Sequence, residues 1–84
     1  MSPTERVYRQ FSGTKLKEAR LALGISRNRL APYVGCTVMS LYSWETGKRT
    51  PSSRFLAPLA SNLRTTIEYF YDVQVGSKKS DAKG

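Results

Sequence analysis

Residues 26–52 read SRNRLAPYVGCTVMSLYSWETGKRTPS, and this stretch decides the fold that we predict. Ser26 and Thr37 are good helix N-caps, because their hydroxyls accept free backbone N–H groups of a first helical turn. Gly35 lies between the two caps, where the chain must reverse and a positive φ costs glycine little. Gly47 is placed to end the second helix, and a basic loop follows it. The stretch therefore predicts two short helices joined by a tight turn.

Apolar spacing indicates which sides of these two helices face inward. Leu30, Ala31 and Val34 fall on one face of the first helix. Ala31 is small enough to let the second helix cross closely. In the second helix, Leu41 and Trp44 are three residues apart and are expected in the core.

The stretch resembles the helix-turn-helix of the Cro/lambda-repressor-like family, also called the XRE family. The matching positions are Ala31, Gly35, Cys36, Leu41 and the run WETGKRTPS at 44–52. The resemblance extends from about Gly13 to Tyr71. It implies an all-α, compact five-helix lambda-repressor-like DNA-binding domain, over residues 12–75, in which helices 2 and 3 form the helix-turn-helix.

The remaining helices are predicted on either side of that pair. The first runs from Gly13 or Thr14 to Leu23, with Leu16, Ala19 and Leu23 on or beside its inward face. The fourth spans residues 52–63. The fifth is expected from Ile67 to about Asp72 or Val75, with Glu68 in a first turn that suits the helix dipole.

Flexible segments are expected at both ends of this domain. Residues 1–11 are predicted to be a flexible N-terminal arm, and residues 76–84 a disordered basic tail. A solvated arm is the simpler interpretation; the alternative is that Arg6 and Arg9 reach the DNA backbone.

Two prolines conflict with the helical pattern. Pro32 and Pro58 each follow Leu-Ala and fall inside the second and fourth predicted helices. A proline there removes a backbone hydrogen bond and clashes with the preceding turn, at roughly 3 kcal/mol. Either each helix is loosened or kinked at its first turn, or each begins later than the family pattern implies.

Composition limits the classes of function. The formal net charge is +8, which suits a polyanionic partner, although a merely basic soluble surface is the alternative. With one cysteine and no histidine, we expect no disulfide, no metal site, no catalytic residues and no cofactor. Cys36 is expected to be a buried small hydrophobe. We also expect a non-enzymatic, cytoplasmic protein, bacterial or phage and nucleoid-associated, with no membrane span and no small-molecule ligand.

The predicted DNA contacts fall into two groups. Side chains of a recognition helix, Val38–Trp44, would read base edges in the major groove. The predicted base contacts are Thr37, Val38, Met39, Tyr42 and Ser43. The predicted phosphate contacts are Arg27, Asn28, Ser40, Thr46, Lys48 and Arg49. For Val38 the alternative is packing beneath the helix, and for Lys48 and Arg49 it is a solvated turn.

The reading surface is mainly apolar and small. Residues 38–43 contain no Arg, Asn or Gln, so the bidentate pairings with guanine and adenine are missing. Val38 and Met39 can instead meet thymine methyl groups. We expect thymine-rich or degenerate readout, with much of the specificity carried by DNA shape.

The resemblance implies two further features. Arg20 and Glu45 would form a structural ion pair between the first and third helices. Family members commonly dimerise, and the dimer candidates here are Ile67, Tyr69 and Tyr71.

Two functions compete on these observations. The first is sequence-specific binding of double-stranded DNA by a small transcriptional repressor, which we expect to act as a homodimer. The alternative is an antitoxin or adaptor-type protein-interaction module on the same fold, which the apolar pair Val38 and Met39 would favour.

Overall fold

Hydroxyl side chains start three of the four α-helices in the computed structural model, which describes residues 6–76. Each accepts the backbone N–H three residues further on, which satisfies one free donor of the first turn. These caps are Ser12, Ser26 and Thr37, with oxygen-to-nitrogen distances of 3.2, 3.2 and 3.0 Å. The caps at Ser26 and Thr37 were predicted, whereas Ser12 was not.

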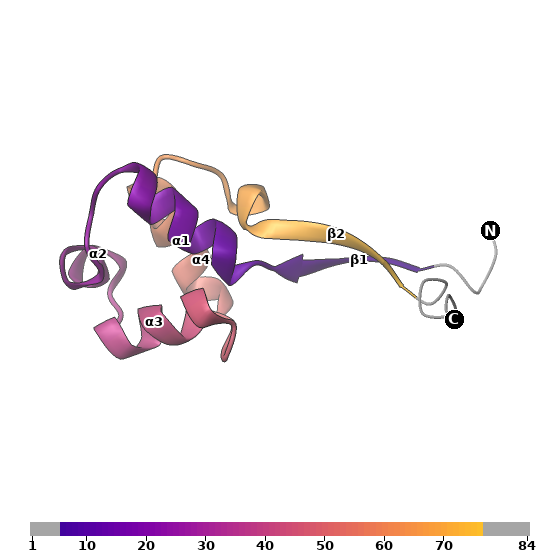
Figure 1. The fold of residues 1–84 in the computed structure, drawn as a ribbon, viewed down its shortest axis with the longest axis horizontal. Coiled ribbons are helices and arrows are strands. Elements are labelled where there is room, and N and C mark those ends of the chain that lie inside the picture. Colours follow the sequence, from indigo (N-terminus) through magenta and orange to yellow (C-terminus); the bar gives the residue numbers. More distant parts are fainter. Residues whose placement is uncertain (1–5, 77–84) are drawn as a thin grey trace.

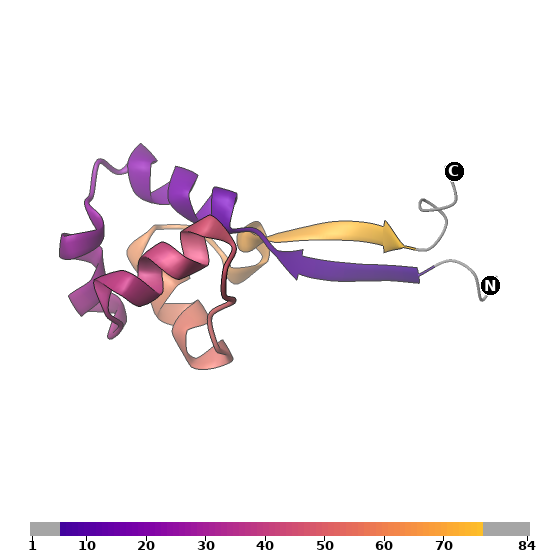
Figure 2. The same ribbon diagram turned by 60° about the horizontal axis from the view of Figure 1, so that its bottom comes forward.

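The elements follow one another closely along the chain. They are β1 (Arg6–Phe11), α1 (Gly13–Ala22), α2 (Arg27–Val34), α3 (Val38–Thr46), α4 (Ser53–Asn62), the 3-10 helix η1 (Ile67–Phe70) and β2 (Tyr71–Gly76). The helices gather at one end, and the two strands project from them as a ribbon (Figure 1). Figure 2 shows α3 lying along the outside of this helical group.

Left-handed glycines end both helices of the central pair. Gly35 caps α2 with φ 87°, and Gly47 caps α3 with φ 83°. Such values suit glycine, which has no Cβ to clash with its own carbonyl. The predicted turn and stop are therefore confirmed.

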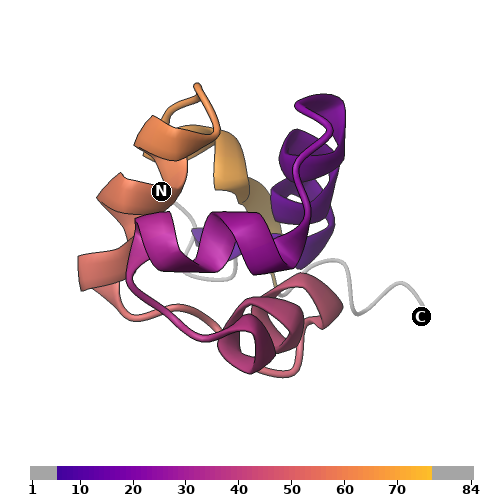
Figure 3. The same cartoon turned by 90° about the vertical axis from the view of Figure 1, so that its left-hand side faces the viewer.

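The core lies where the four helices and η1 meet. Figure 3 shows the helices arranged around this point, and the buried apolar residues come from every helical element. They are Leu16, Leu30, Ala31, Val34, Leu41, Trp44, Leu59, Ala60, Leu63 and Phe70. The start of α1 approaches the end of α3 so closely that a Cβ on Gly13 would meet the Trp44 carbonyl oxygen. Leu23, which we expected near the inward face of α1, is 43% exposed, so that expectation is wrong.

The expected fifth helix is the main difference from the predicted fold. Only Ile67–Phe70 is helical, as a 3-10 turn, and Tyr71–Gly76 is a strand. The sequence YDVQV alternates apolar and polar residues and contains two β-branched valines, a pattern that fits a strand better than a helix. The body is thus a four-helix version of the expected domain, extended by a two-stranded sheet.

The strand β1 occupies part of the segment that we expected to be a flexible arm. It pairs antiparallel with β2, from Arg6 opposite Gly76 to Phe11 opposite Tyr71. Residues 1–5 and 77–84, the rest of the two predicted tails, lie outside the described residues.

The ribbon is anchored where it joins the helices. The Phe11 ring lies 5.9 Å from the Phe70 ring and 5.7 Å from the Tyr71 ring, centroid to centroid. Lys15 of α1 forms an ion pair with Asp72 of β2 at 2.9 Å. This hydrogen bond raises the pKa of Lys15.

Both prolines lie inside helices that begin where the family pattern places them. Pro32 is in α2, which starts at Arg27, and Pro58 is in α4, which starts at Ser53. A later start of either helix is therefore excluded.

None of the helices in the described part of the chain is long and apolar enough to cross a membrane.

Candidate nucleic-acid interface

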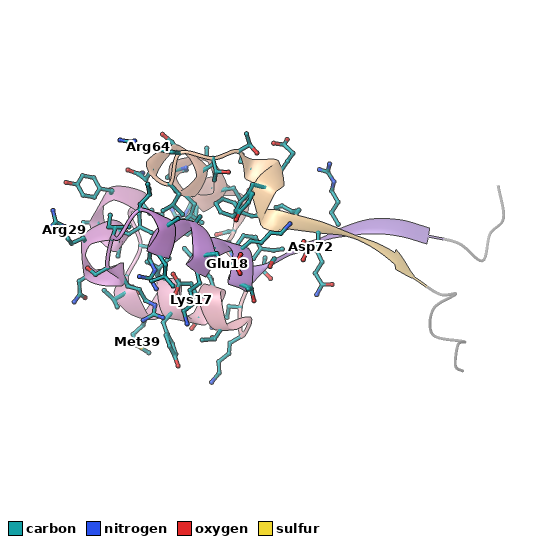
Figure 4. The ribbon with its side chains drawn as sticks, turned by 45° about the horizontal axis from the view of Figure 1, so that its top comes forward. Lys17, Glu18, Arg29, Met39, Arg64 and Asp72 are labelled. Atoms are coloured by element: carbon teal, nitrogen blue, oxygen red, sulfur yellow. The ribbon has the colours of Figure 1, made fainter. Side chains whose placement is uncertain are left out.

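Helix α3 turns one side to the core and the other to solvent. Leu41 and Trp44 are 0% and 5% exposed, as expected. On the outer side, Val38, Met39 and Tyr42 are 37%, 70% and 44% exposed. Figure 4 shows Met39 at the edge of the molecule, with Arg64 at the opposite edge. Three of the five predicted base-contacting side chains therefore form an exposed apolar and aromatic surface.

Two hydroxyl groups at the start of α3 form a hydrogen bond with each other. The Thr37 hydroxyl donates to the Ser40 hydroxyl at 3.1 Å and accepts the Ser40 backbone N–H. At the other end of the helix, the Thr46 hydroxyl donates to the Ser43 carbonyl oxygen at 3.3 Å. Ser40 and Ser43 are half-buried, whereas Thr37 and Thr46 are exposed. These bonds fix the backbone at both ends of the surface.

A buried carboxylate ties α3 to two other helices. Glu45 Oε2 accepts from Arg20 Nε at 2.6 Å, and Glu45 Oε1 accepts from Arg20 Nη2 at 3.1 Å. Arg20 also donates from Nη1 to the Ile25 carbonyl oxygen at 2.9 Å. The Glu45 side chain is fully buried and that of Arg20 is 6% exposed. The two residues expected to pair thus lie together in the core.

Arg27 has a role that we did not predict. Its Nε donates to Glu45 Oε1 at 2.9 Å, and its guanidinium carbon lies 5.0 Å from the centroid of the Tyr42 ring. We expected Arg27 to contact a phosphate, but in this structure it joins Glu45 to the exposed face of α3. Tyr42 and Glu45 are three residues apart on α3, so one side chain from α2 can reach both of them.

Exposed polar and basic residues lie in two segments next to α3. Asn28 and Arg29 are exposed in the first turn of α2, and Lys48 and Arg49 are exposed after α3. The backbone N–H groups of Lys48 and Arg49 both donate to the Ser43 carbonyl oxygen, at 3.0 and 3.2 Å. The backbone that carries these two cations is therefore fixed to the end of α3.

The three dimer candidates differ in their surroundings. Ile67 and Tyr71 are half-buried and pack against the core. Tyr69 is 37% exposed, and Lys15 Nζ lies 5.5 Å from its ring centroid. Only Tyr69 of the three presents much of its surface to solvent.

Cys36 is half-buried and packs against the core, and burial raises the pKa of its thiol. This is partly the small hydrophobe that we expected. Within residues 6–76, no three His, Cys, Asp or Glu side chains gather as a metal site would require.

Comparison with known proteins finds a matching family model and several similar solved structures. The family model described as "Helix-turn-helix" matches residues 16–70. Among solved structures, the P22 c2 repressor in complex with a synthetic operator is 24% identical, with a TM-score of 0.69, over 73% of this chain and 92% of that chain. The restriction-modification controller protein C.AhdI from Aeromonas hydrophila is 29% identical, with a TM-score of 0.65, over 69% of this chain and 88% of that one.

A third solved structure is SinR, the master regulator for biofilm formation, in complex with DNA. It is 29% identical, with a TM-score of 0.63, over 68% of this chain and 95% of that chain. No curated protein matches this sequence.

Proposed function

The chain belongs to the XRE family of helix-turn-helix proteins, and from that membership we propose that it is a repressor whose helix α3 reads the major groove of double-stranded DNA. At the coarser level it is a DNA-binding transcriptional regulator, as the family and its solved relatives are. Two of the solved relatives are complexes, one with a synthetic operator and one with DNA. Sequence specificity, repression and the docking of α3 belong to the proposal.

The observation that carries this proposal is the orientation of α3. Its inner residues and Glu45 hold the helix to the core, while Val38, Met39 and Tyr42 face outward. A helix held in this way can enter a major groove about 12 Å wide without unfolding. Val38 and Met39 would then meet thymine methyl groups, and Tyr42, Thr37 and Ser43 would meet polar base edges.

Phosphate contacts would supply most of the affinity. Asn28 lies in the first turn of α2, where free backbone N–H groups and the helix dipole favour an anion. Lys48 and Arg49 follow the end of α3. The hydroxyls of Ser40 and Thr46 on α3 would add two further phosphate contacts. If about five phosphates are neutralised, log K should fall with log salt at a slope of about −4 to −5.

The test is selection of bound duplexes from a random pool, with wild type and three variants. We expect Met39→Ala to relax the preference at one base position, and Arg49→Ala to weaken binding to all sequences alike. Arg64→Gln is the matched control, because Arg64 is exposed at the opposite edge from Met39 (Figure 4). Enrichment of no sequence by the wild type would refute the proposed function.

Homodimerisation is part of the proposal. Two copies would place their α3 helices roughly 34 Å apart on a pseudo-palindromic site. Tyr69 is the candidate with an exposed ring, so Tyr69→Ser should shift the monomer–dimer equilibrium measured by sedimentation. An unchanged equilibrium would move the interface away from η1.

The alternative function is a protein-interaction module, which the exposure of Val38, Met39 and Tyr42 favours. Salt dependence separates the two functions. DNA affinity falls steeply with salt, whereas burial of an apolar surface against a protein depends on salt only weakly.

A further inference from the structure

Arg27 and Tyr42 form a contact between α2 and the outward side of α3. The guanidinium group lies against the ring, with its carbon 5.0 Å from the ring centroid. At this distance the cation is attracted to the π-face of the tyrosine. The contact covers part of one ring face, and the Tyr42 side chain as a whole remains 44% exposed.

The position of Arg27 is fixed by a group that cannot move easily. Its Nε donates to Glu45 Oε1, and the same carboxylate takes two further hydrogen bonds from Arg20. Glu45 is fully buried, so its carboxylate needs these donors and stays in place. The buried carboxylate therefore holds, through the Nε–H, the guanidinium group that lies over the Tyr42 ring.

Arg27 is the more exposed of the two arginines that pair with Glu45. One carboxylate lies between two guanidinium groups, and the Arg27 side chain is 29% exposed whereas that of Arg20 is only 6% exposed. Removing Arg27 leaves the Arg20–Glu45 pair intact. Arg27 can therefore be changed without leaving a buried charge unpaired.

We infer that Arg27 is a positioning residue: held by Glu45, it fixes the Tyr42 ring in the orientation with which Tyr42 reads one base-pair position. This inference rests on the proposed function and identifies how one of its contacts is made specific. A tyrosine on a helix surface has two free side-chain torsions, and ordering them on binding lowers affinity. With Arg27 in place, the Tyr42 torsions are already largely ordered before DNA binds.

The two roles of Arg27 predict different results. A phosphate contact acts through charge, so it strengthens binding to all sequences and is largely kept by lysine. A positioning contact acts through the planar guanidinium face and the directed Nε–H, which lysine lacks. Arg27→Lys therefore separates the two roles while keeping a cation beside Glu45.

The experiment compares Arg27→Lys, Tyr42→Ala and the double variant on the duplex that the wild type selects, and repeats the selection with each. We expect each single variant to weaken binding, Arg27→Lys by roughly two- to ten-fold, the factor that follows from ordering one side chain. Both should lose preference at the same base position. The double variant should bind no more weakly than Tyr42→Ala alone, because the two residues act as one unit. Arg29→Lys, in the same turn of α2, is the matched control and should keep the wild-type preference.

Salt dependence and folding are measured alongside. Arg27→Lys should keep the wild-type salt slope and the urea midpoint reported by Trp44 fluorescence to within a small shift. The inference is overturned if Arg27→Lys retains the wild-type base preference, or if its effect adds in full to that of Tyr42→Ala. In both of those results the wild type still selects a sequence, whereas failure of the proposed function leaves the wild type without any selected sequence.

Discussion

The buried carboxylate of Glu45 should be the most sensitive polar group in the domain. Glu45→Gln keeps the size of the side chain but removes the charge, so Arg20, which is 5% exposed, is left with a buried cation and no anionic partner. Breaking a buried pair in this way costs about 3–5 kcal/mol. A chain of 84 residues has a free energy of unfolding on the order of 4–12 kcal/mol, so the loss is a large share of the total.

Urea unfolding followed by Trp44 fluorescence measures this loss directly, since Trp44 is the single tryptophan and lies in the core. With a slope of about 1 kcal/mol per molar urea, a loss of about 3–5 kcal/mol lowers the midpoint by roughly 3–5 M. Glu68→Gln is the matched control, because Glu68 is exposed and its change should stay within about 0.5 kcal/mol. Replacing both partners, by Arg20→Met with Glu45→Leu, should recover much of the loss. If the urea midpoint of Glu45→Gln lies within about 0.5 M of the wild-type midpoint, the Arg20–Glu45 pair is not buried.

Two substitutions and one reactivity measurement test separate parts of the fold. Gly13→Ala should lower the free energy of unfolding by about 1–3 kcal/mol, because its Cβ would overlap the Trp44 carbonyl oxygen and lie 2.7 Å from that of Glu45; stabilisation would contradict this contact. Pro32→Ala should raise it by about 1–2 kcal/mol, since alanine restores a helical N–H in α2; a lower urea midpoint would argue against a regular helix there. Because burial raises the pKa of the Cys36 thiol, the folded protein should react with a thiol reagent more slowly than the urea-unfolded chain at equal pH, and equal rates would disprove its burial. The fold favours the protonated thiol, so stability should fall as pH rises past the ordinary thiol pKa.

Local chemistry made the central helices predictable. Ser26, Thr37, Gly35 and Gly47 specify helix starts and stops through groups within a few residues, so no knowledge of distant packing is needed. The apolar spacing of α3 likewise identified its inner and outer sides. The orientation of Met39 follows from that spacing alone.

The ends of the domain were harder to predict because they depend on each other. Residues 71–75 alternate apolar and polar residues, but Thr66 with Glu68 suggested a helix that would begin before them and continue through them. The strand forms because residues 6–11, sixty residues away, supply a complementary edge. The pattern of a single segment does not contain this pairing, so the sequence predicts an arm in place of β1 and a helix in place of β2.

Arg27 illustrates the same limit at the candidate site. Its place after a cap made a phosphate contact reasonable, since helix N-termini favour anions. What the sequence does not state is that Glu45, eighteen residues later, keeps one carboxylate oxygen within reach of it. The contact depends on how α2 crosses α3, which is a property of the packed core.

The composition of the reading surface makes this contact matter more. Residues 38–43 carry no Arg, Asn or Gln, so few groups on α3 can form directional hydrogen bonds with bases. Methyl contacts from Val38 and Met39 tolerate small shifts, whereas the hydroxyl of a tyrosine must meet its partner at a defined distance and angle. A surface with few polar groups therefore depends strongly on how well each is held. The buried carboxylate that fixes α3 to the core also holds the arginine beside Tyr42. If α3 reads DNA as we propose, the stability of the fold and the selectivity of this surface are therefore coupled through Glu45.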